Sequence, residues 1–245
     1  MSEKYIDKIR TIADFILTMI YPDRCVVCDE VISFDSPGIC KSCQGKLVYI
    51  TTRCFKCGKE LYDERMEYCP DCMDTPHKFY RGFPLYVYND GISKSIYRFK
   101  YGNRRRYAKV YGNEMANRLG AEIMKLKPDA LIPVPLHKKK LKKRGYNQAK
   151  LIADELGKRL CIPVIDDYVV RDKNTTPLKL LNRSERQNNL KKAFKIGRND
   201  VKLNSIVIVD DIYTTGSTVD EISGILLDAG VKKVSYVSLA SGSNI

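Results

Sequence analysis

The sequence predicts an α/β protein in which an open parallel sheet with flanking helices is preceded by a small module held together by metal ions. The first observation is the β-branched run at residues 206–209, which is followed by two aspartates, a threonine-rich loop and a helical pattern over residues 219–228. The second is a set of four Cys-x-x-Cys pairs within the first 72 residues. The third is the length of 245 residues with 44% apolar side chains, which suffices for one domain of roughly 150 residues and a small appendage.

We place three segments along the chain: an N-terminal amphipathic helix at residues 1–20, a double zinc-ribbon module at 21–76 and the α/β domain at 77–245. Apolar positions of the first segment recur at helical spacing, which favours a helix packed by one face over a membrane anchor. No window approaches the roughly 20 apolar residues that cross a bilayer, so we expect a cytoplasmic protein without membrane insertion. The formal net charge of +14 favours polyanionic partners such as nucleic acid or phosphorylated metabolites.

The four Cys-x-x-Cys pairs indicate two zinc sites. A spacing of two residues lets both sulfurs of a pair face one cation, and two pairs supply the four thiolates that tetrahedral Zn²⁺ prefers. Such zincs are structural, and their binding supplies folding free energy to a segment poor in large apolar residues. We therefore expect zinc removal to melt this module first and to leave the sheet largely intact. The predicted ligands are Cys25, Cys28, Cys40, Cys43, Cys54, Cys57, Cys69 and Cys72.

The pairs could ligate zinc sequentially, the first with the second and the third with the fourth, or in an interleaved order. Sequential ligation is favoured because the loops of 10 or 11 residues between neighbouring pairs close at low entropic cost. Disulfides fit a cytoplasmic chain poorly, and a redox Cys-x-x-Cys needs only one pair. The ninth cysteine, Cys161, stands at an apolar helix end and is interpreted as a small buried hydrophobic residue.

The segment after the predicted strand has the chemistry of a sugar-phosphate site. Open α/β sheets bind ligands at the carboxyl ends of their strands, and hydroxyl side chains at a helix N-terminus can surround a phosphate. Two adjacent carboxylates would repel that phosphate unless they faced neutral hydroxyls, so ribose 5-phosphate satisfies both halves of the segment. The predicted site residues are Asp210, Asp211, Thr214, Thr215, Gly216, Ser217 and Thr218.

This order of strand, paired acids, Thr-Thr-Gly-x-Thr loop and helix resembles the signature of type I phosphoribosyltransferases. Residues 87–90, 97–102, 131–136, 144–149 and 183–194, behind paired zinc knuckles, are similar to ComF-type late-competence proteins of the ComF/GntX family. The resemblance implies a domain that binds phosphoribosyl diphosphate (PRPP) together with Mg²⁺, which the oxygens of the ligand and water would mostly hold. It also implies a pyrophosphate site with cations, at Val134, Pro135, Leu136, Lys100, Arg144 and Arg186.

Two positions depart from the family pattern. Leu178 follows Thr176 and Pro177 where the family usually carries a glutamine, which removes a polar group expected to close the site. Thr214 stands where purine-salvage relatives place a base-abstracting aspartate, so we assign no catalytic residue and no acceptor.

Two basic runs favour nucleic acid as a partner. Residues 94–109 hold seven basic side chains interleaved with aromatic ones, a mixture suited to phosphate contacts and base stacking, and residues 138–144 hold six more. Solvated helix faces, or the pyrophosphate site itself, are the alternative interpretation. Single-stranded DNA is preferred over duplex because no recognition-helix motif is present. The predicted contacts are Arg98, Arg104, Arg105, Arg106, Lys138, Lys139, Lys140, Lys142 and Lys143.

Three functional interpretations follow. The family resemblance implies a competence factor that binds single-stranded DNA during transformation and carries a PRPP pocket, and DNA-uptake or recombination proteins could be its partners. The alternatives are a phosphoribosyltransferase of unidentified acceptor and a regulator that senses PRPP.

Overall fold

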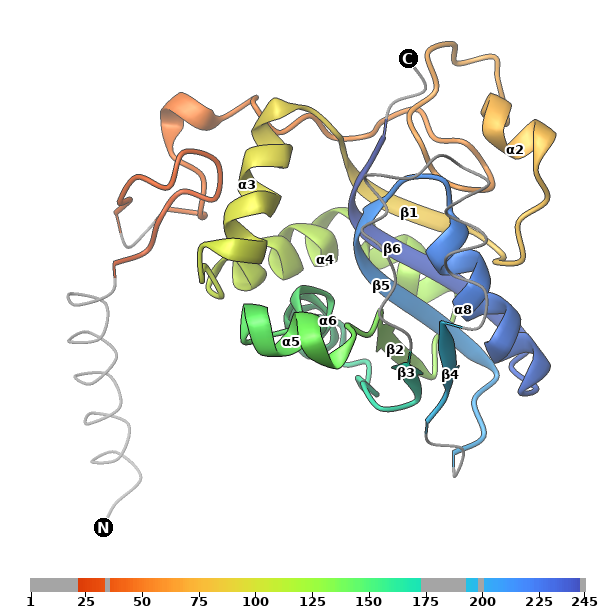
Figure 1. Cartoon of the computed structure of the whole chain (residues 1–245). Coiled ribbons are helices and arrows are strands. Elements are labelled where there is room, and N and C mark those ends of the chain that lie inside the picture. Colours follow the sequence, from red (N-terminus) through yellow and green to blue (C-terminus); the bar gives the residue numbers. More distant parts are fainter. Residues whose placement is uncertain (1–21, 34–35, 173–192, 198–200, 243–245) are drawn as a thin grey trace, which may run out of the picture.

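A computed structural model of the chain describes residues 22–33, 36–172, 193–197 and 201–242. At its centre lies a four-stranded sheet in the order β1-β6-β5-β2 (Figure 1). Every neighbouring pair of these strands is parallel, as the sequence predicted. The strands are β1 (Gly82–Val87), β2 (Ala130–Pro133), β5 (Ser205–Tyr213) and β6 (Lys233–Ser241).

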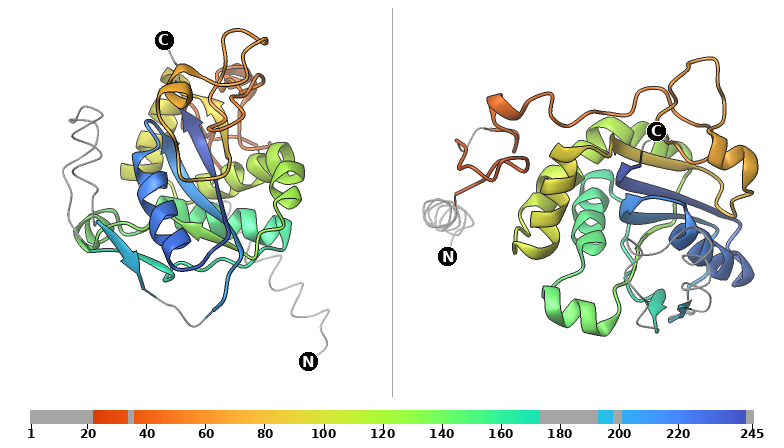
Figure 2. Two further views of the ribbon diagram at one scale, coloured as in Figure 1. Left: turned by 90° about the vertical axis from the view of Figure 1, so that its right-hand side faces the viewer. Right: turned by 45° about the horizontal axis from the view of Figure 1, so that its top comes forward.

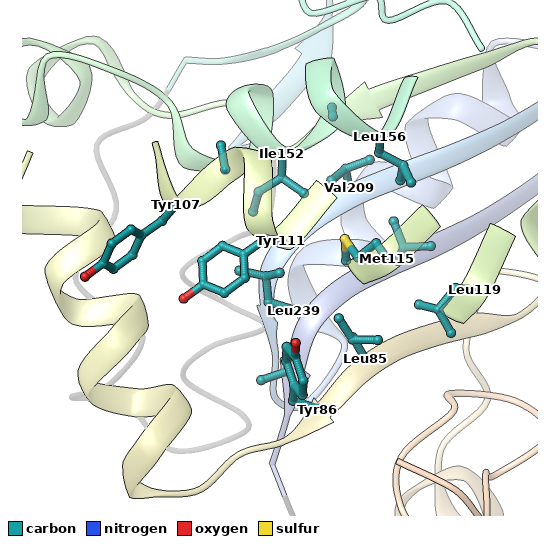
Figure 3. Close-up of a cluster of buried hydrophobic side chains, with 14 of the residues drawn as sticks. Leu85, Tyr86, Tyr107, Tyr111, Met115, Leu119, Ile152, Leu156, Val209 and Leu239 are labelled. Carbon is teal, nitrogen blue, oxygen red and sulfur yellow. The ribbon is translucent and has the colours of Figure 1, made fainter. Parts of the chain in front are cut away.

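Helices cover both faces of this sheet, because the strands of a parallel sheet are apolar on both sides. α4 (Tyr107–Lys125) and α6 (Gln148–Leu160) lie on one face, and α8 (Ser217–Asp228) lies on the other (Figure 2, left). Successive side chains of β5 point to opposite faces of the sheet and so pack into both helical layers. Val207 and Val209 pack toward α4 and α6, whereas Ile206 and Ile208 join the core beneath α8. Figure 3 shows the α4 and α6 side of this core.

Two further helices follow the carboxyl ends of the outer strands of the sheet. α3 (Asp90–Tyr101) comes after β1 and buries Ile92, Ile96 and Phe99. α5 (Lys138–Arg144) comes after β2 and ends at Gly145, which has a φ of 77°. Both helices therefore border the sheet edge at which a ligand is expected.

A separate two-stranded antiparallel sheet joins β3 (Val169–Arg171) to β4 (Phe194–Ile196). Leu178 and Arg186, which the sequence placed near the site, lie in the intervening segment outside the described residues.

The two cysteine modules pack on different parts of the α/β domain (Figure 2, right). The first ribbon, residues 25–43 with the 3-10 helix η1 (Lys41–Cys43), contacts α3, where Arg98 donates a hydrogen bond to the Val27 carbonyl. The second ribbon, residues 54–74 with α2 (Pro70–Asp74), contacts β6, where the Tyr236 hydroxyl donates to the Cys57 carbonyl at 2.7 Å. Each ribbon thus shares buried contacts with the domain.

Two other expectations concern the surface. Cys161 is exposed at the C-terminus of α6 with a φ of 55°, so the expectation that it is buried was wrong. Cys161 is the C-cap residue of α6 and has a left-handed backbone conformation, so the helix ends there. In the described part of the chain, every helix is too short or too polar to span a bilayer. The predicted N-terminal helix at residues 1–20 lies outside the described residues.

Candidate functional site

The eight paired cysteines form two groups of four, and within each group all sulfur atoms lie within 4.8 Å of one another. The first group joins the first two pairs and the second group the last two, which is the sequential arrangement that the sequence favoured. The groups are Cys25, Cys28, Cys40 and Cys43, and Cys54, Cys57, Cys69 and Cys72.

Both groups fit a structural zinc ion. Four sulfurs at this spacing complete a tetrahedral coordination shell and leave no position for a reacting water. Backbone N–H groups also point at the sulfurs: Cys40 donates to Cys25 Sγ at 3.4 Å, and Cys69 donates to Cys54 Sγ at 3.3 Å. Such donors stabilise thiolates, so the residues present suit a bound cation better than neutral thiols.

A cavity of about 520 Å³ lies at the carboxyl ends of β2 and β5, between α3, α5 and α8. It brings together Asp210, Asp211, Thr214, Gly216 and Thr218 of the predicted ribose-phosphate site. β5 continues four residues past the β-branched run, so the two aspartates stand on the strand itself rather than in a loop.

The two carboxylates have different environments. Asp211 pairs with Lys100 at 2.9 Å between side-chain nitrogen and oxygen. Burial raises the pKa of Asp210 to about 7, and the charge of Asp211 adds to the effect. The backbone N–H of Asp211 donates to Asp210 Oδ1 at 2.8 Å and holds that side chain in place. Asp210 is therefore poised between its two protonation states near neutral pH, beside a charged neighbour.

The predicted phosphate loop, residues 214–218, turns into the N-terminus of α8. Gly216 caps this helix with a φ of 79°, a conformation that favours glycine. The hydroxyls of Thr215 and Ser217 lie 2.9 Å apart and hydrogen-bond to each other, and neither residue is among those that line the cavity. The loop thus presents Thr214, Gly216 and Thr218 to a ligand.

Behind the phosphate loop lies a buried histidine that the sequence analysis missed. His77 Nδ1 lies 2.6 Å from Asp220 Oδ2 in the first turn of α8, and the ring stacks on Phe79 at 4.8 Å between centroids. A Cβ atom at Gly216 would lie 2.9 Å from the His77 ring and 2.7 Å from the Tyr213 hydroxyl. His77 therefore fixes the rear of the loop, and only its tertiary position reveals this.

Cations converge on the other side of the cavity. Lys100, Lys140, Arg144 and Arg171 all line it. Burial lowers the pKa of Lys140, and the charges of Arg171, Arg144 and Lys100 lower it further. A bound polyanion would relieve this repulsion, which is the property expected of a diphosphate site. Arg171 carried no sequence signal, because it comes from β3 far along the chain.

Only some of the remaining residues of the predicted pyrophosphate site line the cavity. Val134 and Leu136 line the cavity, whereas Pro135 is buried beside it and is not part of the lining. Arg186 lies outside the described residues.

The residues predicted to bind DNA fall into three groups. Arg98 and Lys140 line the cavity. Three arginines make contacts within the protein: Arg104 pairs with Asp29, Arg106 with Asp23 at 3.2 Å, and the Arg105 guanidinium lies 4.9 Å from the Tyr146 ring centroid. The third group is exposed on α5 and consists of Lys138, Lys139, Lys142 and Lys143.

The aromatic residues of the first basic run also divide. Phe99 and Tyr107 are buried in the core, whereas Tyr97 and Tyr101 are exposed and line the cavity. Tyr88, from the family-like segment at residues 87–90, lines the cavity as well.

Comparison with protein families agrees with this architecture. Residues 16–73 match the double zinc ribbon domain, and residues 113–244 match the phosphoribosyl transferase domain. The fold, the two four-cysteine sites and these matches define a phosphoribosyltransferase-fold protein with an N-terminal double zinc ribbon.

Proteins that are similar over most of the chain identify its family. The chain is 32% identical over 223 residues to Competence protein F of Haemophilus influenzae, covering 89% of this chain and 96% of that one. It is 29% identical over 220 residues to DNA utilization protein YhgH of Escherichia coli, with coverage of 87% and 94%. It is 27% identical over 228 residues to Competence protein ComFC of Bacillus subtilis, with coverage of 84% and 89%. The chain belongs to the ComF family, as its sequence motifs indicated.

Proposed function

We propose that the cavity binds PRPP with Mg²⁺, or ribose 5-phosphate, and that the protein acts in cytoplasmic DNA utilisation and natural competence by binding single-stranded DNA. The observation that carries the proposal is the lining of one cavity by an acid pair, residues of the predicted phosphate loop and six cations. The names of the relatives, which refer to competence and DNA utilization, support the DNA role.

Each part of the ligand has a matching part of the cavity. Asp210 and Asp211 would accept hydrogen bonds from the two ribose hydroxyls. The backbone N–H groups of the phosphate loop at the start of α8 would hold the 5-phosphate. Lys100, Lys140 and Arg144 would contact the diphosphate, and Mg²⁺ held by ligand oxygens and water would neutralise part of its charge.

Transfer of the ribosyl group to an acceptor is a weaker candidate. Positively charged side chains around the diphosphate would stabilise it as a leaving group. Among the described residues, however, the only carboxylates that line the cavity are Asp210 and Asp211, and both would be engaged by the sugar. Thr214 is exposed at the position where purine-salvage relatives carry their base. We therefore favour ligand binding as the principal role of the pocket.

The PRPP proposal is tested by calorimetric titration of the zinc-loaded protein with PRPP and Mg²⁺. The double substitution Asp210→Asn and Asp211→Asn should weaken binding about 100-fold, since two charged acceptors are lost. A matched control, Glu64→Gln with Glu67→Gln on the exposed part of the second ribbon, removes the same charge and should bind normally. Unchanged affinity in the aspartate double variant would refute the site.

The DNA proposal is tested by fluorescence anisotropy of a labelled oligonucleotide at several salt concentrations. Replacing Lys139, Lys142 and Lys143 by glutamine should weaken binding and make the logarithmic salt slope shallower by about 2, because three phosphate contacts are lost. Three exposed lysines at the C-terminal ends of α4 and α6 serve as the control: Lys125, Lys127 and Lys158. Equal losses in the two triple variants would contradict a DNA site on α5.

A further inference from the structure

Two tyrosines form an exposed aromatic pair at the mouth of the cavity. Tyr97 and Tyr101 are 64% and 54% exposed, although most large apolar side chains of the α/β domain are buried. They stand four residues apart on α3, and their ring centroids are 5.0 Å apart. Both rings line the same cavity as Asp210 and Asp211.

The rest of α3 fixes the direction of this pair. The other faces of the helix are buried through Ile92, Ser95, Ile96 and Phe99. Because these residues anchor α3 on the core, the helix cannot turn its tyrosines inward without exposing them. The two rings are thus held at the cavity by the fold.

Arg144 links the aromatic pair to the basic helix α5. Its guanidinium carbon lies 4.9 Å from the Tyr101 ring centroid, and its Nη2 donates to the Tyr101 hydroxyl at 3.0 Å. A guanidinium plane over a tyrosine enlarges the flat surface on which another ring can stack. Exposed lysines continue from Arg144 along α5.

PRPP accounts for the acids and cations of the cavity but for neither tyrosine, because it carries no aromatic ring. We propose that Tyr97 and Tyr101 form a stacking platform for a nucleobase of single-stranded DNA, whose phosphates contact Lys139, Lys142 and Lys143 of α5. Flat aromatic side chains beside positive charge are the combination by which single strands are bound without sequence preference. This inference rests on the proposed DNA function and gives the strand a position, with one base at the mouth of the PRPP cavity.

The platform is tested with the zinc-loaded full chain and a labelled oligonucleotide. Tyr97→Leu with Tyr101→Leu removes the rings but keeps apolar bulk, and should weaken binding about 10-fold or more. The salt slope should stay unchanged, because no phosphate contact is lost. Tyr97→Phe with Tyr101→Phe keeps the rings and should bind within about twofold of the parent. The control pair is Phe55→Leu with Tyr68→Leu, which removes two exposed rings of the second ribbon and should bind like the parent.

A second measurement does not depend on the variants. An oligonucleotide of abasic sites keeps the phosphates, so it should bind the parent protein about 10-fold more weakly than a normal strand. Equal binding of the abasic strand, or normal binding by the leucine pair, would overturn the platform while leaving the DNA function standing. Tighter binding of RNA, or displacement of the strand by an equal concentration of free nucleotide, would overturn single-stranded DNA as the occupant of the platform. A parent protein that binds no single strand at low salt would instead refute the proposed DNA function.

Discussion

Replacing Asp210 by asparagine should stabilise the protein at alkaline pH while it impairs sugar-phosphate binding. The carboxylate of Asp210 lies in a partly buried position next to Asp211, and its pKa is raised to about 7. The folded state therefore holds a proton that the unfolded chain releases at lower pH. Between the unfolded pKa of 3.8 and the folded pKa of about 7, the folded state binds more protons than the unfolded chain, so stability falls as pH rises. Asparagine carries no charge and can still accept the hydrogen bond from the Asp211 N–H.

The size of the effect follows from the two pKa values. A rise from 3.8 to about 7 corresponds to about 4 kcal/mol of destabilisation once Asp210 is fully ionised. This penalty should be absent below the unfolded pKa and complete above the folded one.

Urea denaturation of the zinc-loaded parent and Asp210→Asn provides the assay, between about pH 6 and about pH 8.5, because acid protonates the thiolates and releases zinc. The stability difference in favour of the variant should grow with pH and level off above about pH 8. Glu64→Gln removes an exposed carboxylate of the second ribbon and should show no such growth. A difference that is constant with pH, or a variant less stable than the parent at high pH, would refute the assignment of Asp210 as a buried, destabilising acid.

Three further results are expected. Gly216→Ala should lower the free energy of unfolding by about 2 kcal/mol and abolish PRPP binding in calorimetry, since it combines a strained backbone with a steric clash. The control is Gly230→Ala, at a φ of 95° with no atom within 4 Å of the new Cβ, and this variant should keep PRPP binding. Arg104→Ala should lower stability in urea by about 1 kcal/mol at neutral pH but leave DNA affinity within about twofold, because Arg104 is engaged by Asp29. Burial opposes ionisation of Asp29, but hydrogen bonds from Arg104 and Tyr107 lower its pKa. The stability lost in Arg104→Ala should therefore shrink as pH falls through the pKa of Asp29, and an equal loss at all pH values would contradict the pairing. Zinc chelation should remove near- and far-ultraviolet circular dichroism in one transition, because both ribbons hydrogen-bond to the α/β domain; an early transition confined to the ribbons would instead support the expectation drawn from the sequence, which is so far untested.

The sequence was sufficient where the chemistry is local. Four Cys-x-x-Cys pairs at short, similar spacing leave few ways to surround two cations, and the sequential grouping follows from loop length. The strand, the acid pair and the phosphate loop likewise occupy one continuous segment. Its geometry depends on a strand end and a helix start that neighbouring residues specify.

The sequence was insufficient where tertiary packing decides which basic side chains face the cavity and which pair within the protein. Arg98, Arg104 and Lys140 belong to basic runs that look alike in the sequence. In the fold, Arg104 is engaged by an aspartate of the first ribbon, whereas Lys140 turns toward the cavity. Arg171 completes the cationic side of that cavity from a strand remote in sequence. Charge density therefore predicts the sign of the partner, but only packing decides which cations are available to it.

The second ribbon shows how a zinc module can be coupled to the proposed sugar-phosphate site of the same chain. The carbonyl of the zinc ligand Cys57 accepts a hydrogen bond from Tyr236, whose ring stacks on Tyr213 at 4.7 Å between centroids. Tyr213 directly precedes the phosphate loop, and its hydroxyl lies 3.4 Å from His77, which is hydrogen-bonded to Asp220 of α8. A ribbon without zinc would lose the fixed position of Cys57 and with it the packing that holds the two tyrosines. We therefore expect loss of zinc to disturb the predicted phosphate loop as well as the ribbon itself.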